Sequence, residues 1–163
     1  MSQVHLHLLI THLPVFGSIL GALVLSYGIW VNSNQTKKAA YFIFIISATG
    51  SAIAYLTGEG AEEAVERIQG VSENMIKLHE DAAMYALISL IALGVMSVVA
   101  LLASRFTASL IKSTSIVVLF VSLLSFGLVA RTGYLGGQIR HTEIANSNIL
   151  SNSGAEGGEM DDD

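Results

Sequence analysis

The sequence predicts an all-α integral membrane protein folded as a four-helix bundle. The chain has 163 residues, of which 52% are hydrophobic and only 13% are charged, whereas charged residues make up about a quarter of a typical soluble protein. A helix that crosses a bilayer needs about 20 apolar residues. Stretches of about this length without any charged residue are 13–34, 39–58, 82–104 and 113–130.

We therefore predict membrane-spanning helices over residues 8–32, 39–58, 80–104 and 113–136. The alternative, a soluble protein with buried helices, would show charges along one side of each helix. The first span is not preceded by a basic segment or followed by a small-residue cleavage site, so we expect it to be retained rather than removed as a signal peptide.

The spans and their connections form one predicted domain, residues 1–143. Two further segments are expected outside the membrane. Residues 61–68 place Ala61, Ala64, Val65 and Ile68 on one helical face, which predicts a short interfacial amphipathic helix between the second and third spans. Residues 144–163 are polar, rich in glycine and serine, and acidic, which predicts a disordered tail.

The charges in the connections predict the orientation. The first and third connections contain lysines and an arginine (Lys37, Lys38, Arg105 and Lys112) and no acidic residue. The opposite side carries most of the glutamates and aspartates. Because basic connections stay in the cytoplasm, both termini are expected on the outer side.

Composition also excludes some functions. The chain has no cysteine and a formal net charge of −5. Disulfides, iron–sulfur clusters and thiolate metal sites are therefore absent, and nucleic acid is not an expected partner. The lipid bilayer is an expected partner. None of the hydrolase, phosphate-loop or zinc-protease motifs occurs, so the sequence leaves open whether the protein is an enzyme.

The histidines gather at the outer end of the predicted bundle. His5, His7 and His12 precede or begin the first span, His79 precedes the third, and His141 follows the fourth. Each could be only an interfacial polar residue, but their convergence from three helix ends predicts a binding site. Ionisable groups near the membrane are commonly functional.

Within this site we predict His12 and His79 as the principal metal ligands, because each lies within about a turn of a rigid span. His7 and His141 are predicted as secondary ligands. On a straight helix His7 and His12 point about 140° apart, so both could face one site only if Pro14 bends the helix. Glu62 and Glu143 are the candidate acceptors for the free ring N–H groups.

The fourth span adds candidate residues for binding a cofactor. Gly133 and Gly137 form a small-residue face, which predicts close helix packing or a slot for a flat ring. Arg131 and Arg140 lie near this face and are candidate partners for an anionic group on the cofactor. Gly17, Gly21 and Gly50 predict close helix packing in the first two spans.

Four segments of the chain, taken in order, resemble a widespread bacterial family of small four-helix membrane proteins, catalogued as a domain of unknown function. They are "HLLITHLP", "LTGEGAEE", "LHEDAAMYALISLIAL" and "GYLGGQIRH". The resemblance implies location in the bacterial cytoplasmic (inner) membrane. In the family the last histidine often stands further beyond the Gly-Gly step, whereas here Thr142 and Glu143 follow His141.

The family is similar in layout to four-helix membrane cytochromes, in which paired histidines hold b-type haem. This similarity implies haem b and electron transfer. Two alternatives stay open: a single or paired transition-metal centre without a porphyrin, and a cofactor-free scaffold subunit of a membrane complex. A periplasmic redox partner or a homodimer would fit the electron-transfer function.

Overall fold

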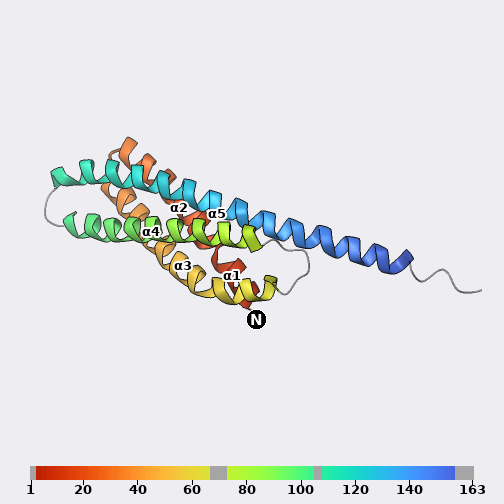
Figure 1. Ribbon diagram of the computed structural model, residues 1–163. Coiled ribbons are helices and arrows are strands. Elements are labelled where there is room, and N and C mark those ends of the chain that lie inside the picture. The colour runs from red at the N-terminus through yellow and green to blue at the C-terminus, as the bar shows by residue number, and fades with distance from the viewer. Residues whose placement is uncertain (1–2, 67–72, 105–107, 157–163) are drawn as a thin grey trace, which may run out of the picture.

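The protein is an antiparallel bundle of long helices in the computed structural model, which describes residues 3–66, 73–104 and 108–156 (Figure 1). The described residues form helices α1 (Gln3–Ile10), α2 (His12–Trp30), α3 (Asn34–Glu66), α4 (Glu73–Ala103) and α5 (Ala108–Glu156). Four stretches are long and apolar enough to cross a membrane: His5–Trp30, Asn34–Gly60, Glu73–Ala103 and Ser113–Ile139. The predicted all-α four-helix membrane bundle is confirmed.

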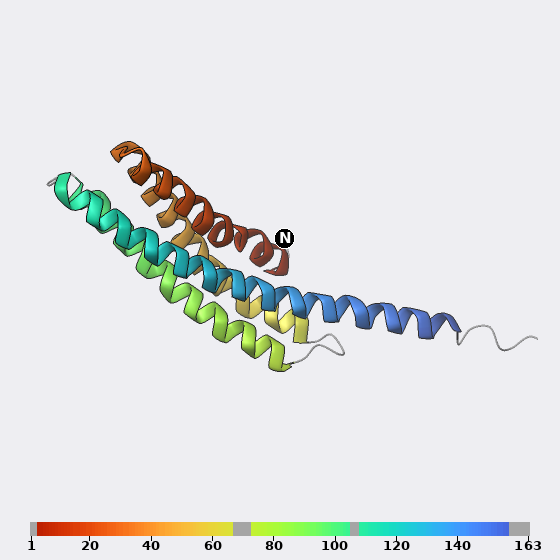
Figure 2. The ribbon, with the colours of Figure 1, turned by 90° about the horizontal axis from the view of Figure 1, so that it is seen from above.

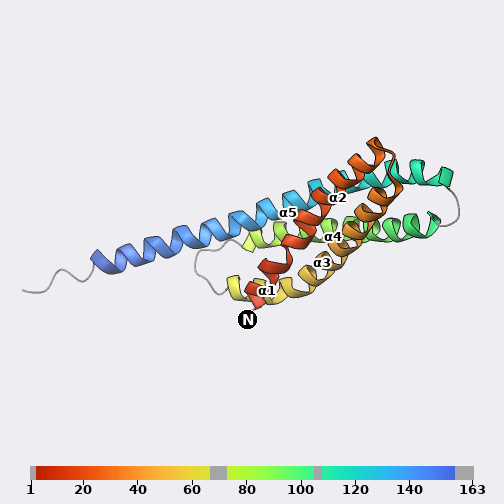
Figure 3. The ribbon, with the colours of Figure 1, turned by 180° about the vertical axis from the view of Figure 1, so that it is seen from behind.

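Each long helix packs against two neighbours. Extensive contacts join α2 to α3, α3 to α4, α4 to α5 and α5 back to α2, and α1 packs on α3. The views from above and behind show the long helices running side by side (Figures 2 and 3), and these contacts close them into a ring. The start of α1, the end of α3 and the start of α4 lie at one end of the bundle, called the histidine end (Figure 1). The end of α2, the start of α3, the end of α4 and the start of α5 lie at the other, called the lysine end after Lys37 and Lys38 (Figure 1).

Pro14 explains why the first span consists of two helices. Proline has no N–H, and its ring clashes with the carbonyl four residues earlier, here that of Ile10. The interruption falls at Thr11, directly after Ile10, and the following bond from Val15 N to Thr11 O is stretched to 3.4 Å. Thr11 N still donates to His7 O at 2.9 Å, so the chain continues in nearly the same direction.

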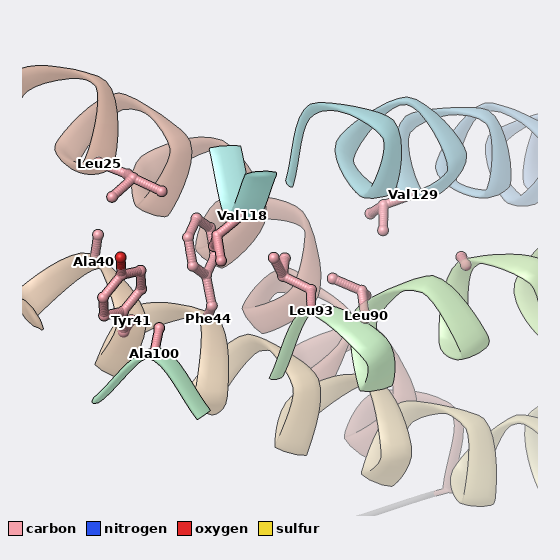
Figure 4. Close-up of a cluster of buried hydrophobic side chains, with 10 residues drawn as sticks. Leu25, Ala40, Tyr41, Phe44, Leu90, Leu93, Ala100, Val118 and Val129 are labelled. Atoms are coloured by element: carbon pink, nitrogen blue, oxygen red, sulfur yellow. The ribbon is translucent and has the colours of Figure 1, made fainter. Parts of the chain in front are cut away.

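The core lies in the middle of the ring and reaches towards the lysine end. Buried apolar side chains come from all four long helices (Figure 4): Leu25 from α2, Ala40, Tyr41 and Phe44 from α3, Ala86, Leu90, Leu93 and Ala100 from α4, and Val118 and Val129 from α5. The Tyr41 hydroxyl is hydrogen-bonded to Ser115 Oγ at 2.8 Å in this core. This bond gives the buried Tyr41 hydroxyl a hydrogen-bond partner.

Glycines let the helices approach closely, as predicted for the first two spans. A methyl group on Gly17 would lie 2.7 Å from Ser47 Cβ, and one on Gly50 would lie 2.6 Å from Leu13 Cβ. Gly21 lies directly against the Phe44 ring. Gly133 and Gly137 differ, because no atom lies within 4 Å of a methyl group built at either position. The predicted close packing through these two glycines is wrong, since both face outward from the bundle.

Two boundaries also differ from the prediction. The segment expected as a separate interfacial helix continues α3 without a break as far as Glu66, while Ile68 lies outside the described residues. Extending a helix is easier than starting a new one, and residues 61–66 are mostly strong helix formers. The first of these reasons also applies to the expected disordered tail from residue 144 to residue 163. It is helical as far as Glu156, so α5 extends beyond the bundle (Figure 2).

The packing of α3 on α4 makes a prediction for stability. Gly94→Ala places a methyl group 2.6 Å from Ala48 Cβ, and neither atom can move without moving its helix. We expect a loss of about 1–3 kcal/mol, as is typical of overpacking, seen as a lower melting temperature in detergent. Gly127→Ala is the matched control, because nothing lies within 4 Å of its methyl group. Equal melting temperatures for the two variants would contradict this packing.

Candidate functional site

Two histidines, His7 and His79, are half-buried at the histidine end of the bundle. His7 lies on α1 and His79 on α4. The two rings are close enough for their positive charges to repel each other when both are protonated. The negative charge of Glu80 attracts a protonated His79 ring. The structure therefore brings together one of the two predicted principal ligands and one of the two secondary ones.

His7 is held against α3 by its Nδ1–H group. This group donates to the carbonyl oxygen of Ala54 at 2.9 Å and also lies 3.3 Å from Thr57 Oγ1. The Thr57 hydroxyl itself donates to carbonyls of α3, so its oxygen can accept from the ring. Gly58 lies beside the imidazole, where an added methyl group would make an ordinary contact, 3.6 Å from His7 Cε1.

His79 is held against α5 in the same way. Its Nδ1–H donates to the carbonyl oxygen of Thr132 at 3.0 Å. Gly136 lies beside the ring, and a methyl group at this position would approach His79 Cε1 to 3.0 Å and Nδ1 to 3.3 Å. This contact is tight, because few real Cβ atoms approach a neighbour so closely.

The carbonyl bonds determine what the rings can do chemically. A carbonyl only accepts hydrogen bonds, so Nδ1 carries the hydrogen in both His7 and His79. In a neutral imidazole the other nitrogen, Nε2, then has a free lone pair. This is the arrangement in which metal-binding histidines are usually found, with one ring nitrogen oriented by a backbone carbonyl and the other available to the metal.

His12 faces the outside of the bundle instead. Its Nδ1–H donates to Leu8 O on its own helix at 2.7 Å, and its ring stacks on Phe16 with 6.0 Å between centroids. The side chain is exposed and lines a shallow surface groove with Thr11 and Val15. The structure therefore does not bring His12 to His79. Pro14 breaks the helix without rotating His12 towards the ring of helices.

The other predicted site residues are spread around this end. Gly133, Gly137 and Arg131 lie on α5 but are exposed, and Gly136 rather than its glycine neighbours faces His79. His5 is also exposed. The side chains of Glu62, Arg140, His141 and Glu143 lie outside the described part of the structure. Among the side chains that are described, no group of three or more His, Asp or Glu residues could hold a metal ion.

Sequence reasoning missed the partners of the two histidines. The sequence does not predict that the carbonyls of Ala54 and Thr132 bind the rings, because every residue has a backbone carbonyl, and the hydroxyl of Thr57 was not predicted as a partner either. The glycines were a usable signal: Gly58 and Gly136 each lie near the histidine end of a span, four residues after the carbonyl that binds the ring.

Comparisons with models of known protein families, with curated proteins and with solved structures gave no match. The resemblance described from the sequence motifs therefore stays a prediction, and the function has to be argued from the histidine end itself.

The burial of the rings predicts their reactivity. Diethyl pyrocarbonate acylates an unprotonated imidazole nitrogen that the reagent can reach. We expect His5 and His12 to react faster than His7 and His79 in detergent-solubilised protein, as measured by mass spectrometry of peptides. Denatured protein is the control, in which all histidines should react alike. If His79 reacted as fast as His12 in the folded protein, its position between α4 and α5 would be wrong.

Proposed function

We propose that the protein binds one b-type haem at the histidine end, with His7 and His79 as the axial ligands, and that it transfers electrons in the membrane. The observation that carries this proposal is the matched state of the two rings. Both are half-buried, they come from different helices, and each has Nδ1–H bound to a carbonyl of a facing helix so that Nε2 is available.

The donor set fits haem better than a bare metal ion. A structural or catalytic zinc site takes three or four protein ligands, and the described residues contain no group of three. Haem iron needs only two axial ligands from the protein, since the porphyrin supplies the other four. Two neutral imidazoles with their tautomer fixed are a sufficient set.

The surrounding residues would orient the ligands and exclude water. The carbonyls of Ala54 and Thr132 hold the two rings and make Nε2 more basic. Ile76 and Ala82, on either side of His79 along α4, are buried and apolar. When bound, the haem would supply one-electron chemistry. Arg131, exposed next to Thr132, and Arg140 are the candidates to meet its propionates.

The same site has two alternative functions. A transition-metal centre would need further ligands, and Glu62, His141 and Glu143 are the candidates. A scaffold subunit would need no cofactor, and the histidines would then serve only to join α1 to α3 and α4 to α5.

Absorbance of the full-length protein, purified after expression with a haem precursor, tests the proposal. We expect a Soret band and the spectrum of six-coordinate low-spin iron. His7→Ala and His79→Ala should each abolish the six-coordinate spectrum, because an axial ligand is removed. His12→Ala is the matched control and should leave it unchanged, since His12 faces outward.

Bound metal without a Soret band would overturn the haem proposal in favour of a metal centre. A folded protein with neither would favour the scaffold. A loss of haem in His12→Ala with full retention in His7→Ala would show that the ligands are those expected from the sequence.

We further propose that the histidine end faces the periplasm of a bacterial inner membrane, where a periplasmic redox partner would receive the electron. The support is the pair of basic connections at the lysine end. An alkaline phosphatase fusion after Asp163 should be active, and a fusion at Lys38 should be inactive, because phosphatase folds only outside the cytoplasm. The opposite pattern would place the site in the cytoplasm.

A further inference from the structure

We infer that the bundle consists of two copies of one helical hairpin, and that the histidine site is assembled from two equivalent half-sites, one in each copy. The first copy is α1–α2 with α3, and the second is α4 with α5 (Figure 3). Three sets of observations support the equivalence: the buried positions of α2 and α4, those of α3 and α5, and the contacts of the two histidines.

The buried positions of α2 and α4 correspond one to one when His7 is matched with His79. From the proline onwards, the buried residues of α2 are Pro14, Ser18, Gly21, Ala22, Leu25 and Gly28. At the same distances from His79, the buried residues of α4 are Ala86, Leu90, Leu93, Gly94, Ser97 and Ala100. Neither helix has a further buried residue in this stretch.

The buried residues of α5 also fall on buried positions of α3 when Gly58 is matched with Gly136. The buried residues of α5, among the described side chains, are Ser115, Val118, Ser122, Ser125 and Val129. Their counterparts in α3 are Lys37, Ala40, Phe44, Ser47 and Ser51, all buried. Helix α3 has four further buried residues, whose counterparts in α5 are half-buried: Tyr41, Ala48, Gly50 and Ala54. The packing order of the ring, α2–α3–α4–α5, is also the order that a twofold axis along the bundle requires.

The alignments are anchored on the two histidines and on the glycines beside them, and the carbonyls that bind the rings then fall on equivalent positions. In the first copy His7 donates to the carbonyl of Ala54 and lies beside Gly58. In the second, His79 donates to the carbonyl of Thr132 and lies beside Gly136. Ala54 and Thr132 are equivalent positions, each four residues before the matched glycine. Each half-site is therefore a histidine, a carbonyl and a glycine on the facing helix.

Two equivalent half-sites related by a twofold axis suit a ligand with two like faces. The axial positions of a planar metal macrocycle are such faces, and each can take one imidazole. This statement of the ligand class rests on the proposed function, whereas the equivalence of the half-sites does not. The equivalence implies that the carbonyl and the glycine of each half-site orient its histidine ring.

The half-sites differ at one position, which supplies the test. Thr57 offers its hydroxyl to His7 Nδ1 at 3.3 Å, and the equivalent position in α5 is Leu135. If the half-sites are equivalent, the hydroxyl can be transferred. Leu135→Thr should place an acceptor near His79 Nδ1, and Thr57→Leu should remove one from His7.

The measurement is the nitrogen and proton shift of each Nδ1–H group in cofactor-free, histidine-labelled protein in detergent micelles. In Leu135→Thr we expect the His79 signal to move towards that of His7. In Thr57→Leu we expect the His7 signal to move towards that of His79. Tyr134→Thr is the matched control, because Tyr134 is exposed and a hydroxyl there faces away from the ring.

A folded Leu135→Thr protein with an unmoved His79 signal would overturn the equivalence, and so would a Tyr134→Thr control that moved it. This result is separable from the proposed function. The hydroxyl transfer succeeding in a protein that never binds haem would leave the repeat standing and refute the haem proposal. If both histidines bind haem but the His79 signal does not move in Leu135→Thr, the haem proposal would stand and the repeat would be refuted.

Discussion

The histidine end depends on one constraint, which is that an imidazole withdrawn from water must keep its N–H hydrogen-bonded. An unsatisfied buried donor costs about 1–3 kcal/mol, and an apolar bundle offers few acceptors besides backbone carbonyls. His7 and His79 meet the constraint by reaching to carbonyls on neighbouring helices rather than on their own. Helix carbonyls already accept one bond each, but the oxygen has a second lone pair that a side chain can use.

This way of satisfying the ring has consequences for the neighbouring helix. A side chain can reach the carbonyl of a facing helix only where that helix has little bulk in the way. Gly136 provides the clearance for His79, whereas an added methyl group at Gly58 would make only an ordinary contact with His7. The same bonds select the tautomer, which leaves Nε2 of both rings with a lone pair. The metal binding that we propose for this site would thus follow from how the rings are accommodated, and no acidic residue is needed to orient them.

The sequence was sufficient for the architecture but not for the helix ends. Charge-free stretches predicted four spans because the bilayer itself imposes their length. Nothing comparable ends a helix outside the membrane, so α3 continues to Glu66 and α5 to Glu156. Polar composition alone predicted a separate helix and a tail there. A polar composition shows that a segment can lie in water, but it does not show whether the segment is helical. A helix that has already formed can extend through polar residues.

The choice between His7 and His12 could have been made from the sequence with one more step. Their divergence of about 140° follows from helix geometry, and it leaves only one of them facing the bundle. The helical face on which the small residues of the span lie shows which of the two histidines faces the bundle. Pro14, Ser18 and Gly21 form the buried stripe of α2, and His7 lies on the extension of that stripe whereas His12 does not. Proximity to the rigid span favoured His12, but facing the neighbouring helix matters more than rigidity.

The internal repeat, in contrast, is nearly invisible in the sequence. Aligned by their histidines and glycines, the two copies share few residues, among them Phe42 with Phe120 and Ser47 with Ser125. Lipid accepts almost any apolar side chain, so outward positions of the two copies can diverge freely. Inward positions are constrained by volume rather than identity, and Gly21 opposite Phe44 in one copy becomes Leu93 and Ser122 in the other. Large and small residues have exchanged sides while the space between the helices is still filled. What stays alike is the histidine and the glycine beside it, although only Gly136 lies so close to its ring that an added methyl group would crowd it.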